Sequence, residues 1–502
     1  MDGPFHATIS NTDAIQYMSE AKILAWNTGI QITGKVFSTA IGVVVIGLMT
    51  RYLGQDGFGV YTTANSFLQV FALILDLGIN VMLVQMLGER AGDKAYEDRA
   101  TSAVFTFRLV TALAFLTLAP IIGLFLDYPW ELKLAFFAIW GSYFSSVMNQ
   151  IVIGTEQRHF KMHYAALAEV VGRIVTLAGL LIGIGSGLGV VGLTLIVSVG
   201  STANFLLNLV LGRRHASFAW NWDPAFWRTL LHRSWPIGIS ILFNLIYFRA
   251  DTLILSYVRP LNEVGIYGAA YRVLEILITL PFMYCGVLLP LVAKAWAEKD
   301  KERFNRLYRN ALSTMALLAA PMVAGVFVMG DRIMLAIAGD DFVASGMILK
   351  ILILAAAVIY LGTVSSHAIV ALNAQRKSIP LYIAVAVVTL AGYVIFIPRY
   401  GMYAAAWLTV FSEGAIAVGT TAISFYIAKS GFATVAITKA SACAATMALA
   451  ILPLRDMWLP IPIIAGALIY GLLVIITGTV SRQTIKEILT FRRGTPSSGM
   501  DV

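Results

Sequence analysis

The chain has 502 residues, of which 59% are hydrophobic and only 13% are charged, and its formal net charge is +9. This composition excludes a mainly soluble enzyme, because soluble domains carry far more charge. The positive charge does not indicate nucleic-acid binding, since the sequence has no basic, aromatic-interleaved segment that could follow a phosphate backbone.

Fourteen apolar stretches follow one another along the chain. A helix rising ~1.5 Å per residue needs ~20 apolar residues to cross ~30 Å of hydrocarbon, and each stretch meets that length. We expect membrane-spanning helices at 23–49, 60–87, 100–126, 132–153, 165–184, 190–211, 235–257, 264–291, 311–329, 344–371, 379–397, 402–427, 433–454 and 461–480. The sequence therefore predicts an all-α polytopic membrane protein with 14 transmembrane helices.

Lysine and arginine are unevenly distributed among the connecting segments. Residues 1–22, every second loop and residues 481–502 together hold 23 of them, whereas the loops between and their edges hold six or seven. Because positively charged segments tend to stay in the cytoplasm, this pattern places both termini there. We expect residues 1–22 to be a cytoplasmic lead-in to a retained first helix, since no small-residue cleavage site follows. The loops on the opposite side are too short to hold a catalytic domain.

Two pairs of segments indicate an internal repeat. Residues 58–69 align with 264–275 at a shift of 206, which matches Gly59 with Gly265, and a weaker match at a shift of 212 relates the starts of the sixth and twelfth helices. Each shift corresponds to six helices. Because six is an even number, the repeats keep the same orientation in the membrane, as parallel repeats do.

The repeat defines the expected domain organisation. We predict an N-lobe of six helices at 23–212, a cytoplasmic linker at 213–234 and a C-lobe of six helices at 235–428. Two further helices are appended at 433–480, and a cytoplasmic tail follows at 481–502. Two packed bundles with a cleft between them are the usual architecture for alternating access.

Several cationic side chains fall within the predicted helices. A charge at a helix centre costs ~2.5–3.5 kcal/mol, so it should face a partner or a water-filled cavity. Lys35 shares a helix face with Asn27 and Gln31, since these residues repeat every fourth position. Such a cation on a polar face suits an anionic ligand such as a diphosphate.

Arg249 and Arg272 are the corresponding cations of the C-lobe. Asn244 and Asp251 lie on the polar face of the predicted seventh helix, and Arg249 is close to both. Arg272 lies among polar residues of the predicted eighth helix. We predict that Lys35, Arg249 and Arg272 line the cavity; structural ion pairing is the alternative for each.

Five further ionisable residues are candidates for ion coupling or ion pairing: Asp76, Asp251, Glu275, Glu413 and His367. A carboxylate or a histidine inside the membrane can carry a proton or bind a cation, or it can be a hydrogen-bonded buried residue.

One further charged pair has a simpler interpretation. Glu169 and Arg173 are four residues apart with the acid first, which predicts an ion pair within one helix.

No pattern indicates a catalytic or metal site. The two cysteines, Cys285 and Cys443, stand alone in apolar runs, and no P-loop, Gly-x-Ser-x-Gly or His/Cys metal spacing is present. We therefore expect no bound cofactor or metal and no enzymatic activity, although H⁺ or Na⁺ can serve as a coupling ion.

Residues 27–85 resemble the opening of bacterial oligosaccharide flippases of the Wzx-like polysaccharide transport family. The resemblance rests on a polar-then-apolar first helix, on TRYLG-x-x-GFG-x-Y at its outer end and on DLG within the second helix. This family belongs to the multidrug/oligosaccharidyl-lipid/polysaccharide (MOP) exporter superfamily. The helix count, the twin bundles and the appended pair are similar to that superfamily, including its MATE branch.

The resemblance implies transport rather than catalysis. It implies that an undecaprenyl-diphosphate-linked sugar repeat unit is moved from the inner to the outer leaflet of the bacterial cytoplasmic membrane, for lipopolysaccharide or exopolysaccharide biosynthesis. It also implies rocking of two lobes and a cationic cavity, to which Lys35, Arg249, Arg272 and, less directly, Arg51 correspond. A monomer working beside a glycan polymerase and chain-length proteins is expected.

Three alternatives stay open. A cation-coupled multidrug exporter and a peptidoglycan-precursor flippase belong to the same superfamily. A membrane glycan polymerase or ligase is less favoured, because such enzymes tend to carry a long outward loop that this chain lacks.

Overall fold

The computed structural model describes residues 11–76, 78–90, 92–159 and 161–479, and of these the side chains of 11–32, 81, 236–237 and 239–248 are not described. The described chain is helical, with no strand. Its helices are α1 (Asn11–Asp76), α2 (Ile79–Glu89), α3 (Lys94–Phe125), α4 (Trp130–Arg158), α5 (Met162–Gly185), α6 (Val190–Gly212), α7 (Pro224–Val258), α8 (Leu261–Ala297), α9 (Lys301–Ala338), α10 (Ser345–Ala371), α11 (Gln375–Ala428), α12 (Thr434–Ile451) and α13 (Pro460–Ile476). Short 3₁₀ turns lie at Asp340–Phe342 and Leu452–Leu454.

Two of these helices contain a sharp kink at a glycine. In α1 the kink is at Gly54, with φ 64°, and in α11 it is at Gly401, with φ 56°. Glycine adopts this positive φ without the steric cost that a Cβ would bring. Divided at these kinks, and with α2 continuing the second half of α1, the described helices give fourteen helical segments in the order that the sequence predicts.

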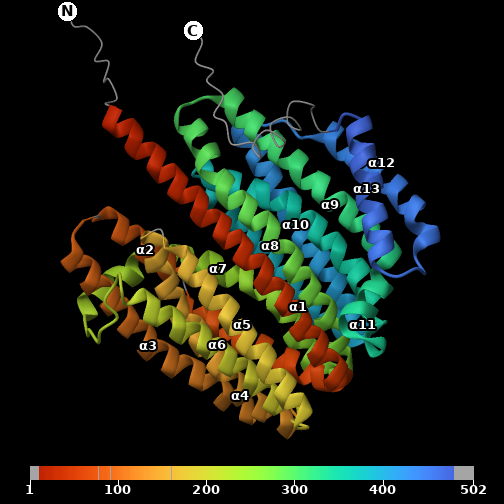
Figure 1. Ribbon diagram of the computed structural model, residues 1–502, viewed down its shortest axis with the longest axis horizontal. Coiled ribbons are helices and arrows are strands. Elements are labelled where there is room, and N and C mark those ends of the chain that lie inside the picture. Colours follow the sequence, from red (N-terminus) through yellow and green to blue (C-terminus); the bar gives the residue numbers. More distant parts are fainter. Residues whose placement is uncertain (1–10, 77, 91, 160, 480–502) are drawn as a thin grey trace, which may run out of the picture. The chain divides into compact units, whose positions relative to one another are not determined.

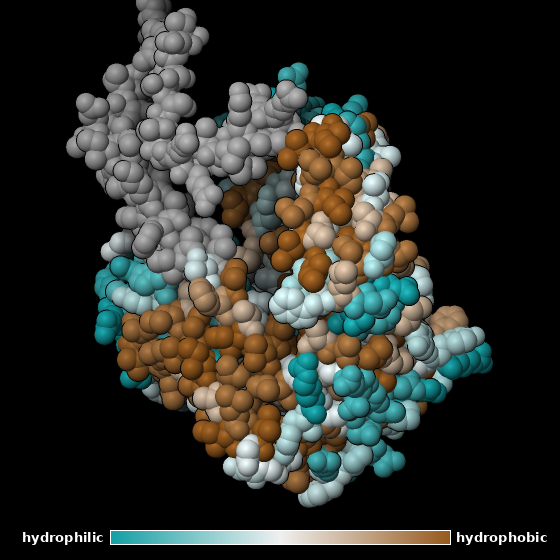
Figure 2. Space-filling view, turned by 45° about the vertical axis from the view of Figure 1, so that its right-hand side comes forward, coloured by the Kyte–Doolittle hydropathy of each residue, from teal (hydrophilic) through white to brown (hydrophobic). Residues whose placement is uncertain are grey.

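The outer surface is apolar, as the membrane requires. Ten of the described helices are long and apolar enough to span a bilayer. Figure 2 shows hydrophobic residues, in brown, covering broad areas of the face that it draws. Because a helix satisfies its backbone hydrogen bonds internally, it can place such a surface against lipid. The chain is a multi-pass membrane protein.

The chain forms two compact units, residues 1–268 and 269–502. In the first unit α4 packs along α6, and α5 packs against both α6 and α1 (Figure 1). Glycine permits this close packing: a Cβ on Gly200 of α6 would lie 1.8 Å from Oγ1 of Thr176 on α5. Small residues at helix contacts are typical of membrane bundles.

The glycines that the repeat aligns meet each other in the first unit. A Cβ on Gly59 would lie 1.9 Å from the carbonyl oxygen of Leu261, and a Cβ on Gly265 would lie 2.0 Å from that of Gln55. Gln55 and Leu261 are themselves related by the shift of 206. The contact is therefore reciprocal, as expected where two parallel repeats cross about a two-fold axis.

The second unit is built around α10. This helix packs against α9 and α11, and its core includes Phe304, Tyr308 and Met315 from α9. α12 and α13 form a separate apolar cluster on α9, which gives the appended pair its place (Figure 1).

The boundary between the two compact units falls between Gly268 and Ala269, within α8. The lobe boundary predicted from the sequence is at 213–234. The lobes at 23–212 and 235–428 stay a prediction.

Candidate functional site

Lys35 of α1 reaches α5 and pairs with Glu169. The Nζ–Oε1 distance is 2.9 Å, and Oγ of Ser38 donates to the same oxygen at 2.7 Å. The side chains are 43% and 30% exposed, so the pair stays accessible. The sequence predicted Arg173 as the partner of Glu169. In the structure Glu169 bonds to Lys35, while the Arg173 guanidinium lies over Gly42 of α1.

Asp76, at the end of α1, pairs with Arg108 of α3. The Nη2–Oδ1 distance is 2.9 Å, and Arg108 also donates to the carbonyl of Leu75. Arg108 is 1% exposed and Asp76 22%. The Arg108 guanidinium thus compensates both the Asp76 carboxylate and the negative C-terminal end of α1. Gly78, whose backbone is in the left-handed conformation, directly precedes α2.

Asp251 of α7 is buried and is satisfied mainly by hydroxyl groups. The hydroxyl of Tyr267 on α8 donates to its Oδ2 at 2.5 Å, and that of Thr252 donates to Oδ1 at 3.2 Å. Arg249, two residues earlier on the same helix, is also buried. The structure therefore places both predicted residues inside the first unit, while the side chain of Asn244 lies outside the described ones.

Arg272 and Glu275 pair within a single helix. Both are on α8 in the second unit, with Nη1 and Oε2 2.8 Å apart, and their side chains are 22% and 21% exposed. Because the two residues are three positions apart, the pair does not cross between helices.

The remaining coupling candidates lie apart in the second unit. Nδ1 of His367 is 2.8 Å from the carbonyl of Thr363, one turn earlier on α10. Glu413, half-buried on α11, makes no ion pair or hydrogen bond within the described part of the chain. No described contact joins His367 to Glu413.

Arg51 is exposed on α1, three residues before the kink at Gly54. Its Nη1 donates to the carbonyl of Gly47 at 3.3 Å. Asn27 and Gln31, the other predicted binding residues of the first helix, have side chains outside the described ones.

The sequence analysis missed one buried carboxylate, Glu156. It ended the fourth helix at residue 153, whereas α4 continues to Arg158 and buries Glu156 to 2% exposure. Beside it, Nδ2 of Asn208 on α6 donates to Oδ1 of Asn149 at 2.8 Å. Asn149 and Glu156 are seven residues apart and lie on one helix face. A predicted fourth helix ending at residue 158 would have placed both side chains on that face.

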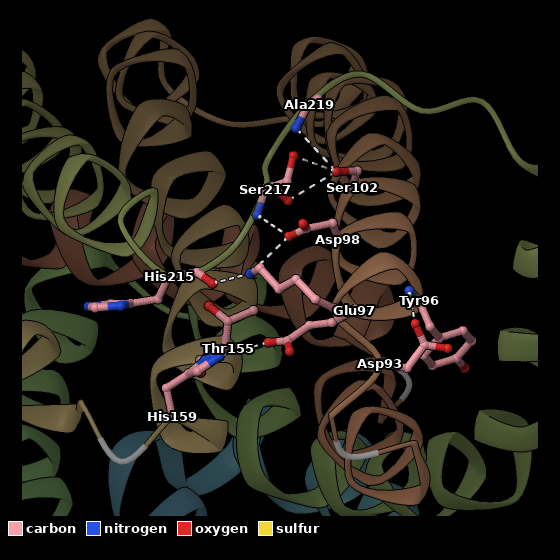
Figure 3. A network of polar contacts seen from close by, with 11 residues as sticks. Asp93, Tyr96, Glu97, Asp98, Ser102, Thr155, His159, His215, Ser217 and Ala219 are labelled. Atoms are coloured by element: carbon pink, nitrogen blue, oxygen red, sulfur yellow. Dashed lines mark hydrogen bonds and ion pairs between the residues drawn. The ribbon is translucent and has the colours of Figure 1, made fainter.

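A polar network ties residues 213–223 to α3 and α4 (Figure 3). Nζ of Lys94 donates to the carbonyl of His215 at 2.6 Å, and Nε2 of His159 lies 2.9 Å from Oε1 of Glu97. Burial and the neighbouring cations, His159 first among them, lower the pKa of His215. This network anchors a loop and does not belong to the predicted cavity.

Comparisons with known proteins agree with this architecture. A family described as polysaccharide biosynthesis protein matches residues 24–296, and the MatE family matches residues 236–398. A probable flippase, AglR of Haloferax volcanii, is 22% identical over 402 residues, 78% of this chain and 81% of that protein.

Solved structures share the fold. The lipid II flippase MurJ in an inward closed conformation has a TM-score of 0.75 at 17% identity, over 89% of this chain and 98% of that one. An inward-facing multidrug resistance MATE family transporter of the MOP superfamily has a TM-score of 0.65 at 16% identity, over 80% and 98%. The all-α fold expected from the sequence is thereby confirmed.

Proposed function

The chain belongs to the polysaccharide biosynthesis protein family, and on that premise we propose that it is a flippase for a polyprenyl-diphosphate-linked oligosaccharide. The family match over residues 24–296 carries this proposal. The MOP-type fold and the likeness to a probable flippase support it. The lipid-linked sugar is moved from the inner to the outer leaflet by alternating access, and the chain acts as a transporter rather than as an enzyme.

The substrate has two parts with opposite solvation needs. Its lipid chain can stay in the bilayer, whereas its diphosphate and sugars lose their hydration unless the protein replaces it. Arg249 and Arg272 are the cations that we assign to the diphosphate, because a guanidinium can bind phosphate oxygens bidentately. Lys35, partly exposed beside Glu169, is the third, and Arg51 stands nearer the outer surface.

Arg272 is the best supported of these residues. Its ion pair with Glu275 lies within one helix, so replacing that carboxylate by a phosphate breaks an intrahelical contact. Asn27, Gln31 and Asn244 complete the proposed polar lining. Asp76, Asp251, Glu275, Glu413 and His367 remain the candidates for coupling to H⁺ or Na⁺.

We further propose the cytoplasmic membrane as the location, with both termini in the cytoplasm, from the distribution of lysine and arginine. The chain works as a monomer and delivers its product to a glycan polymerase with its chain-length proteins.

A cation-coupled exporter is the second candidate. The MatE match at residues 236–398 favours it, and so does Glu413, a half-buried carboxylate without a described ion pair. A drug-susceptibility assay separates the two functions, since an exporter protects cells without affecting surface polysaccharide. A peptidoglycan-precursor flippase differs in being essential for growth.

Complementation tests the proposal. Deleting the gene should abolish surface polysaccharide, and the wild-type gene should restore it, whereas Arg249→Ala and Arg272→Ala should not. Arg332→Ala, which removes an exposed arginine paired with Asp456, is the control and should rescue fully. Membrane levels of each variant are measured in parallel. Normal polysaccharide in the deletion strain would refute the flippase; full rescue by both cavity variants would refute the site.

A further inference from the structure

A basic groove lies at one end of the second unit. It is a cavity of about 520 Å³ between the start of α9, the start of α12 and the residues that follow α13. Arginine side chains line its α9 wall, and Lys439 lines its α12 wall. The groove lies apart from Arg272 and the coupling candidates, none of which contributes to its lining.

The α9 wall provides two available guanidinium groups. Arg306 and Arg309 are three residues apart on one helix face, and both are exposed. Within the described residues neither has a carboxylate partner within ion-pair distance. Glu302, one turn before Arg306, is the one acidic residue of the lining, so the three cations leave the groove with a net positive charge.

The α12 wall adds backbone donors. α12 begins at Thr434, and the side chain of its N-cap residue, Ala433, cannot accept a hydrogen bond from the first turn. Residues 434–436, whose N–H groups have no partner within the helix, line the groove. Lys439, one turn later, donates to the carbonyl of Thr477 at 3.0 Å and so fixes the end of α13 against this wall. Cations beside a helix N-terminus favour an anion.

The position of the groove indicates which anion. Phe432 and Val435 of its lining are exposed apolar side chains; the apolar α12 begins beside the groove and the apolar α13 ends beside it. The groove thus combines charged and apolar groups, as suits a ligand with an anionic headgroup and acyl chains.

We propose that this groove binds the phosphate of an anionic phospholipid from the surrounding leaflet. Arg306 and Arg309 grip the phosphate oxygens, the first turn of α12 donates to them, and Phe432 and Val435 contact the start of the acyl chains. The proposal is independent of transport, because the groove uses none of the residues assigned to the substrate.

Native mass spectrometry of the purified full chain tests this site. Phosphatidylglycerol is titrated against phosphatidylcholine with the same acyl chains. The wild type should retain phosphatidylglycerol preferentially, and Arg306→Gln/Arg309→Gln should bind it about tenfold or more weakly. The control variant, Lys294→Gln/Arg303→Gln, makes the same charge change at residues that pair with Glu298 outside the groove, and should bind as the wild type does.

Three results would overturn the proposal. These are equal retention of the two lipids by the wild type, equal losses in the groove and control variants, and displacement of the lipid by inorganic phosphate at millimolar concentration. The last result would assign the groove to a free anion. Because Arg306 and Arg309 have no described ion-pair partner, the variants should keep the wild-type melting temperature, which is measured alongside.

Discussion

The two units hold their intramembrane charges differently. In the first unit the pairs join separate helices: Lys35 of α1 bonds to Glu169 of α5, and Arg108 of α3 bonds to Asp76 of α1. In the second unit the pair between Arg272 and Glu275 lies within α8, and a pair that joins two helices, Lys350 of α10 with Asp331 of α9, lies toward the ends of those helices. In the same unit, Tyr308 of α9 contacts Ser365 of α10, and so joins two helices through hydroxyl groups.

This difference distinguishes ion pairs that join two helices from an ion pair whose two members share one helix. Removing one member of a buried pair between helices leaves the other without compensation, which destabilises the fold strongly. Removing one member of a partly exposed pair within a helix costs little. Arg108, which is buried and pairs between helices, should therefore affect stability most, and Arg272 should affect transport.

Removal of Arg108 should have the largest effect on the fold. Arg108→Leu leaves Asp76 and the Leu75 carbonyl uncompensated beside a buried site, so we expect a loss of about 3 kcal/mol in the free energy of unfolding. Unfolding in detergent, followed by circular dichroism, measures it. Asp76→Asn in the same chain should recover part of the loss. A melting temperature equal to that of the wild type would show that this pair does not hold α1 and α3 together.

Arg272→Gln should reduce transport at least about tenfold while the free energy of unfolding changes by less than about 1 kcal/mol. The variant loses the proposed phosphate ligand and an ion pair that lies within one helix. Glu275→Gln is the matched control, since it breaks the same pair and keeps the cation. Equal transport losses in both variants would instead indicate that the pair itself is what matters.

Lys35→Gln should lie between these cases. Its pair joins two helices but is 43% and 30% exposed, so we expect a loss of about 1 kcal/mol in the free energy of unfolding. Ser38 still donates to Glu169 in the variant and limits the effect. The melting temperature and the rate of transport are measured together. A loss as large as that of Arg108→Leu would contradict the ordering.

A shift to mildly acidic pH should have the smallest effect on stability, and it should act through His215 in the loop at residues 213–223. Because burial and His159, Lys161 and Lys94 lower its pKa, the unfolded chain binds a proton more readily than the folded one does. The stabilisation of the fold by neutral His215 is thus present above the ordinary histidine pKa of 6.5, and it is lost as the pH falls below 6.5. The wild type should lose slightly more stability than His215→Asn between pH 7.5 and 5.5; a larger loss in the variant would contradict the sign.

The sequence predicted the helices because their signal is local. Apolar length sets the number of spans, and the short gaps predicted near Gly54 and Gly401 correspond to non-helical glycines that separate two helical segments. The repeat even matched Gly59 with Gly265, which lie against each other.

Partners were harder to predict than spans. Lys35 and Glu169 are 134 residues apart, and nothing local in the sequence relates them. Arg173, the sequence-based partner, was the nearest cation along the helix, but α1 brings Lys35 to the same carboxylate. Glu156 was missed for another reason. The predicted fourth helix ended five residues before α4 does, so Glu156 was assigned to a loop rather than to the buried end of the helix. Helix ends are the least certain part of such a prediction.

Reconstituted vesicles test the central claim most directly. A labelled polyprenyl-diphosphate oligosaccharide is placed in the inner leaflet, and its exposure to a membrane-impermeant glycosidase outside is followed over time. The wild type should expose the sugar faster than protein-free vesicles do, and Arg272→Gln should not, although both proteins are folded. Exposure no faster than in protein-free vesicles, or an Arg272→Gln rate equal to that of the wild type, would contradict the account.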